Sequence, residues 1–164
     1  MSPTQIRVGG VATVTGDPTG NTDGTAFDGT NAYFDYINST QGGVCGRKLV
    51  LASKRDDMLS NNRTQVQGLI SQDNVFAVLP VATTLFSGAD LLASNKIPTF
   101  GWDINAEWGS EANNPGPANL FGAVGSFINF KHHIHSHNRD HQPHDGLKQL
   151  KSTKLKNHVT HRYA

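Results

Sequence analysis

The stretch Ile6–Gly16, with the sequence IRVGGVATVTG, constrains the fold more than any other part of the chain. Its apolar residues are Ile and Val, set among small residues and bounded by polar ends, which is typical of a strand buried on both faces. The stretch leads directly into the glycine-rich turn DPTGNTDG, and a helical pattern follows. In open α/β sheets, ligands bind beyond the carboxyl ends of such strands. We therefore expect Ile6–Gly16 to be the central strand of an α/β lobe.

A helix is predicted after the glycine-rich turn. Asp23 and Thr25 are residue types that cap the free N–H groups at the start of a helix. The apolar stripe that follows at helical spacing consists of Ala26, Thr30, Tyr33 and Ile37, with Phe27 and Phe34 beside it. We expect this stripe to pack on the sheet.

Further strands and helices alternate along residues 48–100. Short apolar runs predict strands at Lys48–Ser53, Val75–Leu79 and Ile97–Phe100, and Pro80 is expected to end the second of them. The helices between them have core faces formed by Val66, Leu69 and Ile70 and, within residues 84–95, by Leu85, Ala89 and Leu92. Asn119–Phe130 is predicted to be extended. This alternation predicts βαβ units with right-handed crossovers, and so a doubly wound, mostly parallel α/β sheet.

The composition changes abruptly near residue 130. Residues 1–130 carry 7 Lys and Arg against 11 Asp and Glu, whereas residues 131–164 carry 7 against 2, so a net charge of −4 gives way to +5. All eight histidines lie between His132 and His161. We expect a folded domain over residues 1–130 and a basic, histidine-rich tail over residues 131–164. The tail is expected to be irregular or disordered, because its few apolar residues cannot form a core.

What the sequence lacks argues against several classes of protein. No apolar run approaches the ~20 residues that span a membrane, and the N-terminus MSPTQIRV has no signal-peptide pattern. The single Cys45 excludes an internal disulfide. Residues 1–130 contain no histidine and no G-x-S-x-G motif, and Asp56–Asp57 is expected to cap a helix or to face solvent. We therefore expect a binding protein without a cofactor, and not an enzyme.

Three loops carry polar residues at the predicted carboxyl edge of the sheet. The turn TGDPTGNTDG lacks the G-x-G-x-x-G spacing and the Gly-Lys-Ser/Thr ending of nucleotide-binding loops. In Pro80–Thr84, two threonine hydroxyls and free N–H groups offer a seat for a carboxylate; the alternative is that one Thr only caps a helix. In Gly101–Asn105, Trp102 and Asp103 offer a packing wall and an acceptor, or else form a packed surface loop. Because loops after parallel strands converge, we expect one binding edge.

The ordered series of motifs in residues 5–130 resembles a known family. IRVGGVATVTG, FDGTNAYFDYIN, GGVCGRKLVL, the DD after the second strand and VFAVL before VATT are similar to type 1 periplasmic binding proteins. The branch they resemble is the leucine/isoleucine/valine-binding type of ABC-transporter solute receptor, and the most specific element is N-x-x-x-G-G-V-x-G-R-K-L. The resemblance implies two α/β lobes that close on a ligand, and an extracytoplasmic location. It also implies delivery of an amino acid or related small solute to an ABC permease.

The resemblance also assigns roles to individual residues. It gives Thr83 the hydroxyl that holds the ligand carboxylate, with Ala82 and Thr84 beside it. Trp102 and Asp103 stand in the loop that contacts the ligand's amino group, where amino-acid binders often have small residues and a Thr. This departure leaves the carboxylate seat in place and weakens the expectation of a branched-chain ligand. Residues 1–130 correspond to most of the first lobe alone, so we expect an incomplete solute-binding protein whose own ligand binding is weak or absent.

The tail does not resemble the family at any point. Neutral imidazole groups bind Zn and Ni, and the clustered histidines of the tail include His132, His133, His135 and His137. We expect adventitious metal binding there; the alternative function is a metal-binding accessory protein that acts through the tail. The tail's charge predicts no specific nucleic-acid partner. A further hypothesis is that the tail is an out-of-frame extension that replaces the second lobe.

Overall fold

Five parallel strands in one sheet form the centre of the structure. The computed structural model describes residues 2–20, 22–109 and 115–123, all within the unit Met1–Asn129. The strand order is β2-β1-β3-β4-β5, and every neighbouring pair is parallel. The strands are β1 (Gln5–Ala12), β2 (Lys48–Asp56), β3 (Ala77–Ala82), β4 (Thr99–Gly101) and β5 (Leu120–Gly122). This confirms the predicted parallel α/β sheet, although the middle position belongs to β3 and not to β1.

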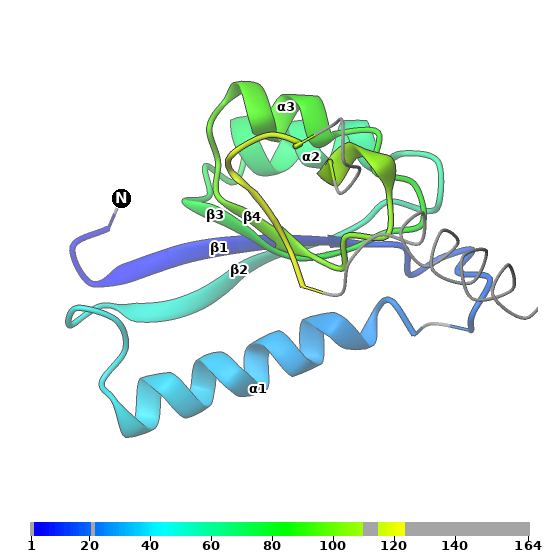
Figure 1. The fold of residues 1–164 in the computed structure, drawn as a ribbon. Coiled ribbons are helices and arrows are strands. Elements are labelled where there is room, and N and C mark those ends of the chain that lie inside the picture. The colour runs from blue at the N-terminus through cyan, green and yellow to red at the C-terminus, as the bar shows by residue number, and fades with distance from the viewer. Residues whose placement is uncertain (1, 21, 110–114, 124–164) are drawn as a thin grey trace, which may run out of the picture. The chain divides into compact units, whose positions relative to one another are not determined.

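Helices cover both faces of this sheet. They are α1 (Thr25–Thr40), α2 (Asn62–Ser71) and α3 (Ala89–Ser94), and a short 3-10 helix, η1 (Ala106–Trp108), follows β4. Figure 1 shows α1 on one side of the sheet and α2 and α3 on the other. The chain therefore crosses between the faces as a doubly wound fold requires.

The larger apolar cluster lies on the face covered by α2 and α3. Its buried members are Val11, Val66, Leu69, Val75, Val78, Val81, Phe86, Ala89, Leu92, Trp108 and Leu120. The Phe86 and Trp108 rings pack with their centroids 5.0 Å apart, which fixes the segment after β4 against the segment before α3. On the other face, α1 packs through Phe27 and Phe34 on two smaller clusters.

Two adjacent glycines in β1 allow the helices of both faces to approach the sheet. A side chain at Gly9 would meet Leu69 of α2 at 2.6 Å, and one at Gly10 would meet Phe27 of α1 at 2.8 Å. Since β1 faces one helix on each side, the GG pair lets both helices lie close to the strand.

The observed elements correct several details of the sequence interpretation. In α1 the buried residues are Phe27, Phe34 and Ile37, whereas Tyr33 is 60% exposed, because the sheet-facing stripe runs through the phenylalanines. No side chain caps this helix: Gly24 is its N-cap residue, so the predicted caps at Asp23 and Thr25 are wrong.

Pro80 does not end β3 but lies within it. The register of β3 shifts on both sides at this point, between Gly9 and Val11 on the β1 side and between Val78 and Val81 on the β4 side. A proline lacks the N–H that a regular ladder requires, and such a bulge removes that requirement.

The third helix is shorter than the predicted 84–95. It begins at Ala89, so Leu85 falls in the preceding loop and is 53% exposed, whereas Leu92 is fully buried as expected. Neither Thr83 nor Thr84 is therefore a helix cap. The predicted tail and its four named histidines, His132, His133, His135 and His137, lie outside the described residues.

Candidate ligand-binding edge

The loops that follow β1, β3 and β4 meet at the carboxyl edge of the sheet. The backbone N–H of Thr84 donates to Thr13 Oγ1 at 3.1 Å, which joins the ends of β3 and β1. The Asn105 side chain donates to the Thr84 carbonyl at 2.9 Å, which joins the loop after β4 to the same point. The three loops that the sequence singled out are thus held together by direct hydrogen bonds.

Asp56, at the end of β2, fastens the loop that leaves β1. Its carboxylate accepts hydrogen bonds from the N–H groups of Val14, Thr15 and Met58 at 2.9–3.2 Å. Partial burial by itself would raise the pKa of Asp56, but the hydrogen bonds from Thr15, Met58 and Val14 outweigh it and hold the pKa below the ordinary value. Asp56 is therefore an ionised anchor for the turn after β1.

Behind this edge lies a buried hydrogen-bond network centred on Asp57. The side chains of Asp57 and Asn62 are fully buried, and Thr83 is only 2% exposed. The Thr83 hydroxyl donates to Asp57, and Asn62 Nδ2 donates to the same carboxylate oxygen at 3.0 Å. Asn62 Oδ1 in turn accepts from the Gly88 N–H at 2.9 Å, so the network ties the start of α2 to the loop before α3.

This network determines where the expected carboxylate seat lies. The Thr83 side chain faces inward to Asp57, and Ala82 is fully buried. Thr84 is half-buried at the surface of the edge, and its hydroxyl makes no hydrogen bond to any described residue. Among the described residues there is also no acceptor for the N–H of Leu85, which follows it. Thr84 and Leu85 are thus two donors that this loop presents.

Trp102 and Asp103 lie on the neighbouring loop and have distinct environments. Trp102 packs against the cluster of Ala12, Phe27 and Ala82, which includes the residue before Thr83. It also borders a groove of about 380 Å³ between α1 and β4. Trp102 therefore forms an apolar wall beside the loop after β3.

Asp103 has a strained backbone and an unsatisfied carboxylate oxygen. Its φ is 65°, and its Oδ1 is buried without a hydrogen-bond partner among the described residues. Burial raises the pKa of Asp103. The side chain packs directly on Gly122 at the end of β5, where any Cβ would collide with it. One acceptor of this half-buried carboxylate is therefore left without a hydrogen bond among the described residues.

A further carboxylate, Asp23, lies close to the network. It is 4% exposed, and burial, together with the negative charges of Asp17 and Asp57, raises its pKa to about 6. Asp23 lies near the end of the glycine-rich turn and does not cap α1. The interaction of these three acidic residues could not be predicted from the sequence, because they come from two separate loops.

The sequence interpretation missed the residues that support this edge. Thr13, Asp56, Asp57 and Asn62 were not among the predicted site residues, yet they position the loops that were. The available signal was the pair of acidic residues directly after a buried strand, followed within six residues by Asn62. Among the described residues no group of His, Cys, Asp or Glu side chains is arranged to hold a metal ion.

Residues 5–127 match the family of periplasmic binding proteins. The chain belongs to the periplasmic binding protein family. Members of this family bind solutes and do not act as enzymes, which agrees with the interpretation of residues 1–130 as a binding scaffold. Within the described part of the chain, no helix is both long and apolar enough to cross a membrane.

The fold is similar to that of a solved solute-binding structure. The structure is similar to a fatty acid ABC transporter substrate-binding protein from Thermomonospora curvata, with a TM-score of 0.65 and 17% sequence identity. The similarity covers 84% of this chain and 35% of that chain, so the periplasmic binding protein described here spans about a third of its solved neighbour. Comparison with curated proteins gives no match.

Proposed function

We propose that this chain supplies one ligand-binding lobe of an extracytoplasmic solute receptor for an ABC importer. The observation that carries the proposal is the joining of the loops after β1, β3 and β4 by hydrogen bonds at one edge, in a chain of the periplasmic binding protein family. Ligands of open α/β sheets bind at this edge. The partner in this proposal is an ABC permease, and the mechanism is closure of lobes around the ligand rather than a reaction.

The proposed ligand is an amino acid or a similar small carboxylate solute. The Thr84 hydroxyl and the Leu85 N–H are donors for a carboxylate, and the half-buried Asp103 carboxylate is an acceptor for an ammonium group. Trp102 supplies an apolar wall beside the loop after β3. Thr83 and Ala82 contribute indirectly in this proposal, because their buried positions fix the backbone that carries Thr84.

We expect the chain by itself to bind such a solute weakly. In the proposed receptor, the ligand contacts are shared between two lobes, so one lobe supplies about half of the binding free energy. Halving the roughly −8 kcal/mol of a micromolar complex leaves about −4 kcal/mol, which corresponds to a dissociation constant of about 1 mM.

Tryptophan fluorescence tests the proposal because Trp102 lies at the proposed site. The full chain would be titrated with a panel of amino acids and, for comparison, with their carboxamides, which lack the carboxylate charge. We expect at least one amino acid to change the emission at millimolar concentration, with no comparable effect from its carboxamide. Trp102→Phe should abolish the change. A signal that survives this substitution, or equal responses to acid and carboxamide, would contradict the proposed site.

A further inference from the structure

A second cavity lies at the opposite end of the strands from the ligand-binding edge. Its volume is about 520 Å³, and its walls come from the start of β1, the turn before β2 and the segments that follow α2 and α3. This volume is within the range of small-molecule sites, roughly 300–1,000 Å³. None of the residues that line it belongs to the loops after β1, β3 or β4, so this cavity needs an explanation of its own.

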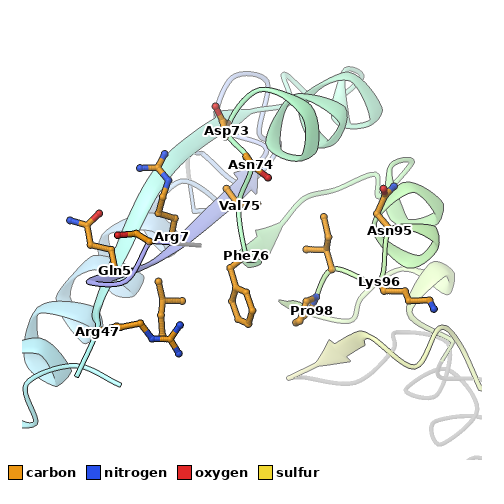
Figure 2. A pocket seen from close by; sticks show the side chains of 13 residues that line it. Gln5, Arg7, Arg47, Asp73, Asn74, Val75, Phe76, Asn95, Lys96 and Pro98 are labelled. Atoms are coloured by element: carbon orange, nitrogen blue, oxygen red, sulfur yellow. The ribbon is translucent and has the colours of Figure 1, made fainter. Parts of the chain in front are cut away.

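The floor of the cavity is apolar and unusually exposed. Phe76 is 44% exposed, although large aromatic side chains next to a sheet are normally covered. Figure 2 shows its ring in the space between Arg47, from the turn before β2, and Pro98, from the segment before β4. Ile6 and Ile97 add partly buried aliphatic surface. This floor is suited to the apolar body of a ligand.

The polar part of the cavity is positively charged. Arg7, Arg47 and Lys96 line it, and the only carboxylate among the lining residues is Asp73. The Asp73 carboxylate is bound to Arg55 Nε at 2.8 Å, so its charge is already compensated from outside the cavity. In Figure 2, Arg7 and Lys96 point away from Phe76, whereas the Arg47 side chain extends from one side toward the Phe76 ring. A guanidinium has five N–H donors in a plane that matches a carboxylate.

The backbone at two positions of the wall is held in a conformation that favours glycine. Asn74 and Lys96 have φ values of 50° and 55°. They follow α2 and α3, and the next N–H in each case returns to the helix, from Val75 to the Leu69 carbonyl and from Ile97 to the Leu92 carbonyl. Helix ends of this kind normally use Gly or Asn. Lys96 is therefore less favourable for stability here than glycine would be, and it adds a cation to the rim.

We propose that this cavity is a second small-molecule site, for an anion with an apolar body such as an aromatic or short aliphatic carboxylate. The carboxylate pairs with the Arg47 guanidinium, and the apolar body packs on Phe76 and Pro98. Arg7 and Lys96 add long-range attraction at the rim. The site is independent of the proposed solute site, because the two lie at opposite ends of the same strands and share no residue.

Amide NMR of the isotope-labelled full chain tests this proposal with benzoate as the probe and benzyl alcohol as its uncharged counterpart. We expect benzoate to shift the amide signals of Phe76, Lys96 and Ile97, and to bind more weakly as the salt concentration rises. Benzyl alcohol should bind much more weakly. Shifts confined to Thr84, Trp102 and their neighbours would overturn the second site, as would equal affinity for the two probes.

Three variants separate the charge from the apolar floor. Arg47→Gln should weaken benzoate binding about tenfold, because a hydrogen bond to a charged group is lost. Phe76→Ala should weaken it about fivefold. Lys96→Gly should weaken it about twofold while leaving the chain at least as stable, since glycine suits the backbone at this position.

Matched controls lie elsewhere on the same unit. Phe121→Ala removes a phenyl ring that is 48% exposed on β5, and Lys54→Gln removes an exposed cation on β2. Both should bind benzoate as the wild type does. Wild-type affinity in Arg47→Gln, or the same loss in Phe121→Ala as in Phe76→Ala, would overturn the proposal.

Discussion

Replacing Thr83 with valine removes one hydroxyl from the polar network behind the binding edge and keeps the branched shape of the side chain. The lost group donates to Asp57, and the two residues are 2% and 0% exposed, so water has no access to replace the donor. Asp57 retains hydrogen bonds from Asn62 Nδ2 at 3.0 Å and from the Leu59 N–H at 3.0 Å. The Asp57 carboxylate thus loses one hydrogen bond and keeps two.

The magnitude follows from the charge of the acceptor. A hydrogen bond to a charged group contributes roughly 1.5–3 kcal/mol, and we expect Thr83→Val to lower the free energy of unfolding by about 2 kcal/mol. With a urea dependence of ~1–3 kcal/mol/M, the unfolding midpoint should fall by about 1 M. Urea titration of the full chain followed by far-ultraviolet circular dichroism measures this shift.

Thr84→Val is the matched control, because this hydroxyl has no hydrogen-bond partner among the described residues and lies half-exposed. Its unfolding free energy should change by less than ~0.5 kcal/mol. Equal midpoints for the wild type and Thr83→Val would refute the reasoning, since the Thr83 hydroxyl would then contribute nothing to the buried network. A large loss in Thr84→Val would do so as well.

Three further changes test other parts of the edge. Asp23 has a pKa raised to about 6, so the folded state binds its proton more tightly than the unfolded state does, and stability is lost as the pH rises through 6. Asp23→Asn should therefore raise the free energy of unfolding by roughly 1–2 kcal/mol at pH 7.5, and calorimetric melting should show that gain vanishing below about pH 4. Asp56 has a lowered pKa, so its contribution is present above the ordinary carboxyl pKa and is lost as the pH falls through the folded value. Asp56→Asn should cost ~1–2 kcal/mol at pH 7, with a smaller difference near pH 3, in the same melting experiment. Gly122→Ala should displace Asp103, because any Cβ at position 122 collides with that side chain. Amide NMR should then show its largest changes at Trp102 and Asp103. Changes confined to β5 would contradict this packing.

The strands were predictable because each buried run is short, apolar and bounded by polar or glycine-rich segments. Ile6–Gly16 contains β1 after its first residue, and the Gly9–Gly10 pair explains why such small residues stand in a central region of the sheet. The convergence of the three loops was also predictable, because parallel strands place their carboxyl ends at one edge.

The orientation of Thr83 could not be read from the sequence. Its partner Asp57 is 26 residues away, and Asn62 at the start of α2 hydrogen-bonds to both side chains. The position of Pro80 within β3 likewise depends on register shifts against two neighbouring strands. Both features arise from tertiary contacts rather than from local pattern, so local rules gave the wrong boundary at Pro80 and no orientation at Thr83.

The account's central claim is that a small carboxylate solute binds at the edge formed by the loops after β1, β3 and β4. The most direct measurement is an amide NMR titration of the full chain with amino acids up to tens of millimolar. We predict saturable shifts at Thr84, Leu85, Trp102 and Asp103, with a dissociation constant of about 1 mM for the best ligand. The absence of saturable shifts at these four residues for every amino acid tested would contradict the claim.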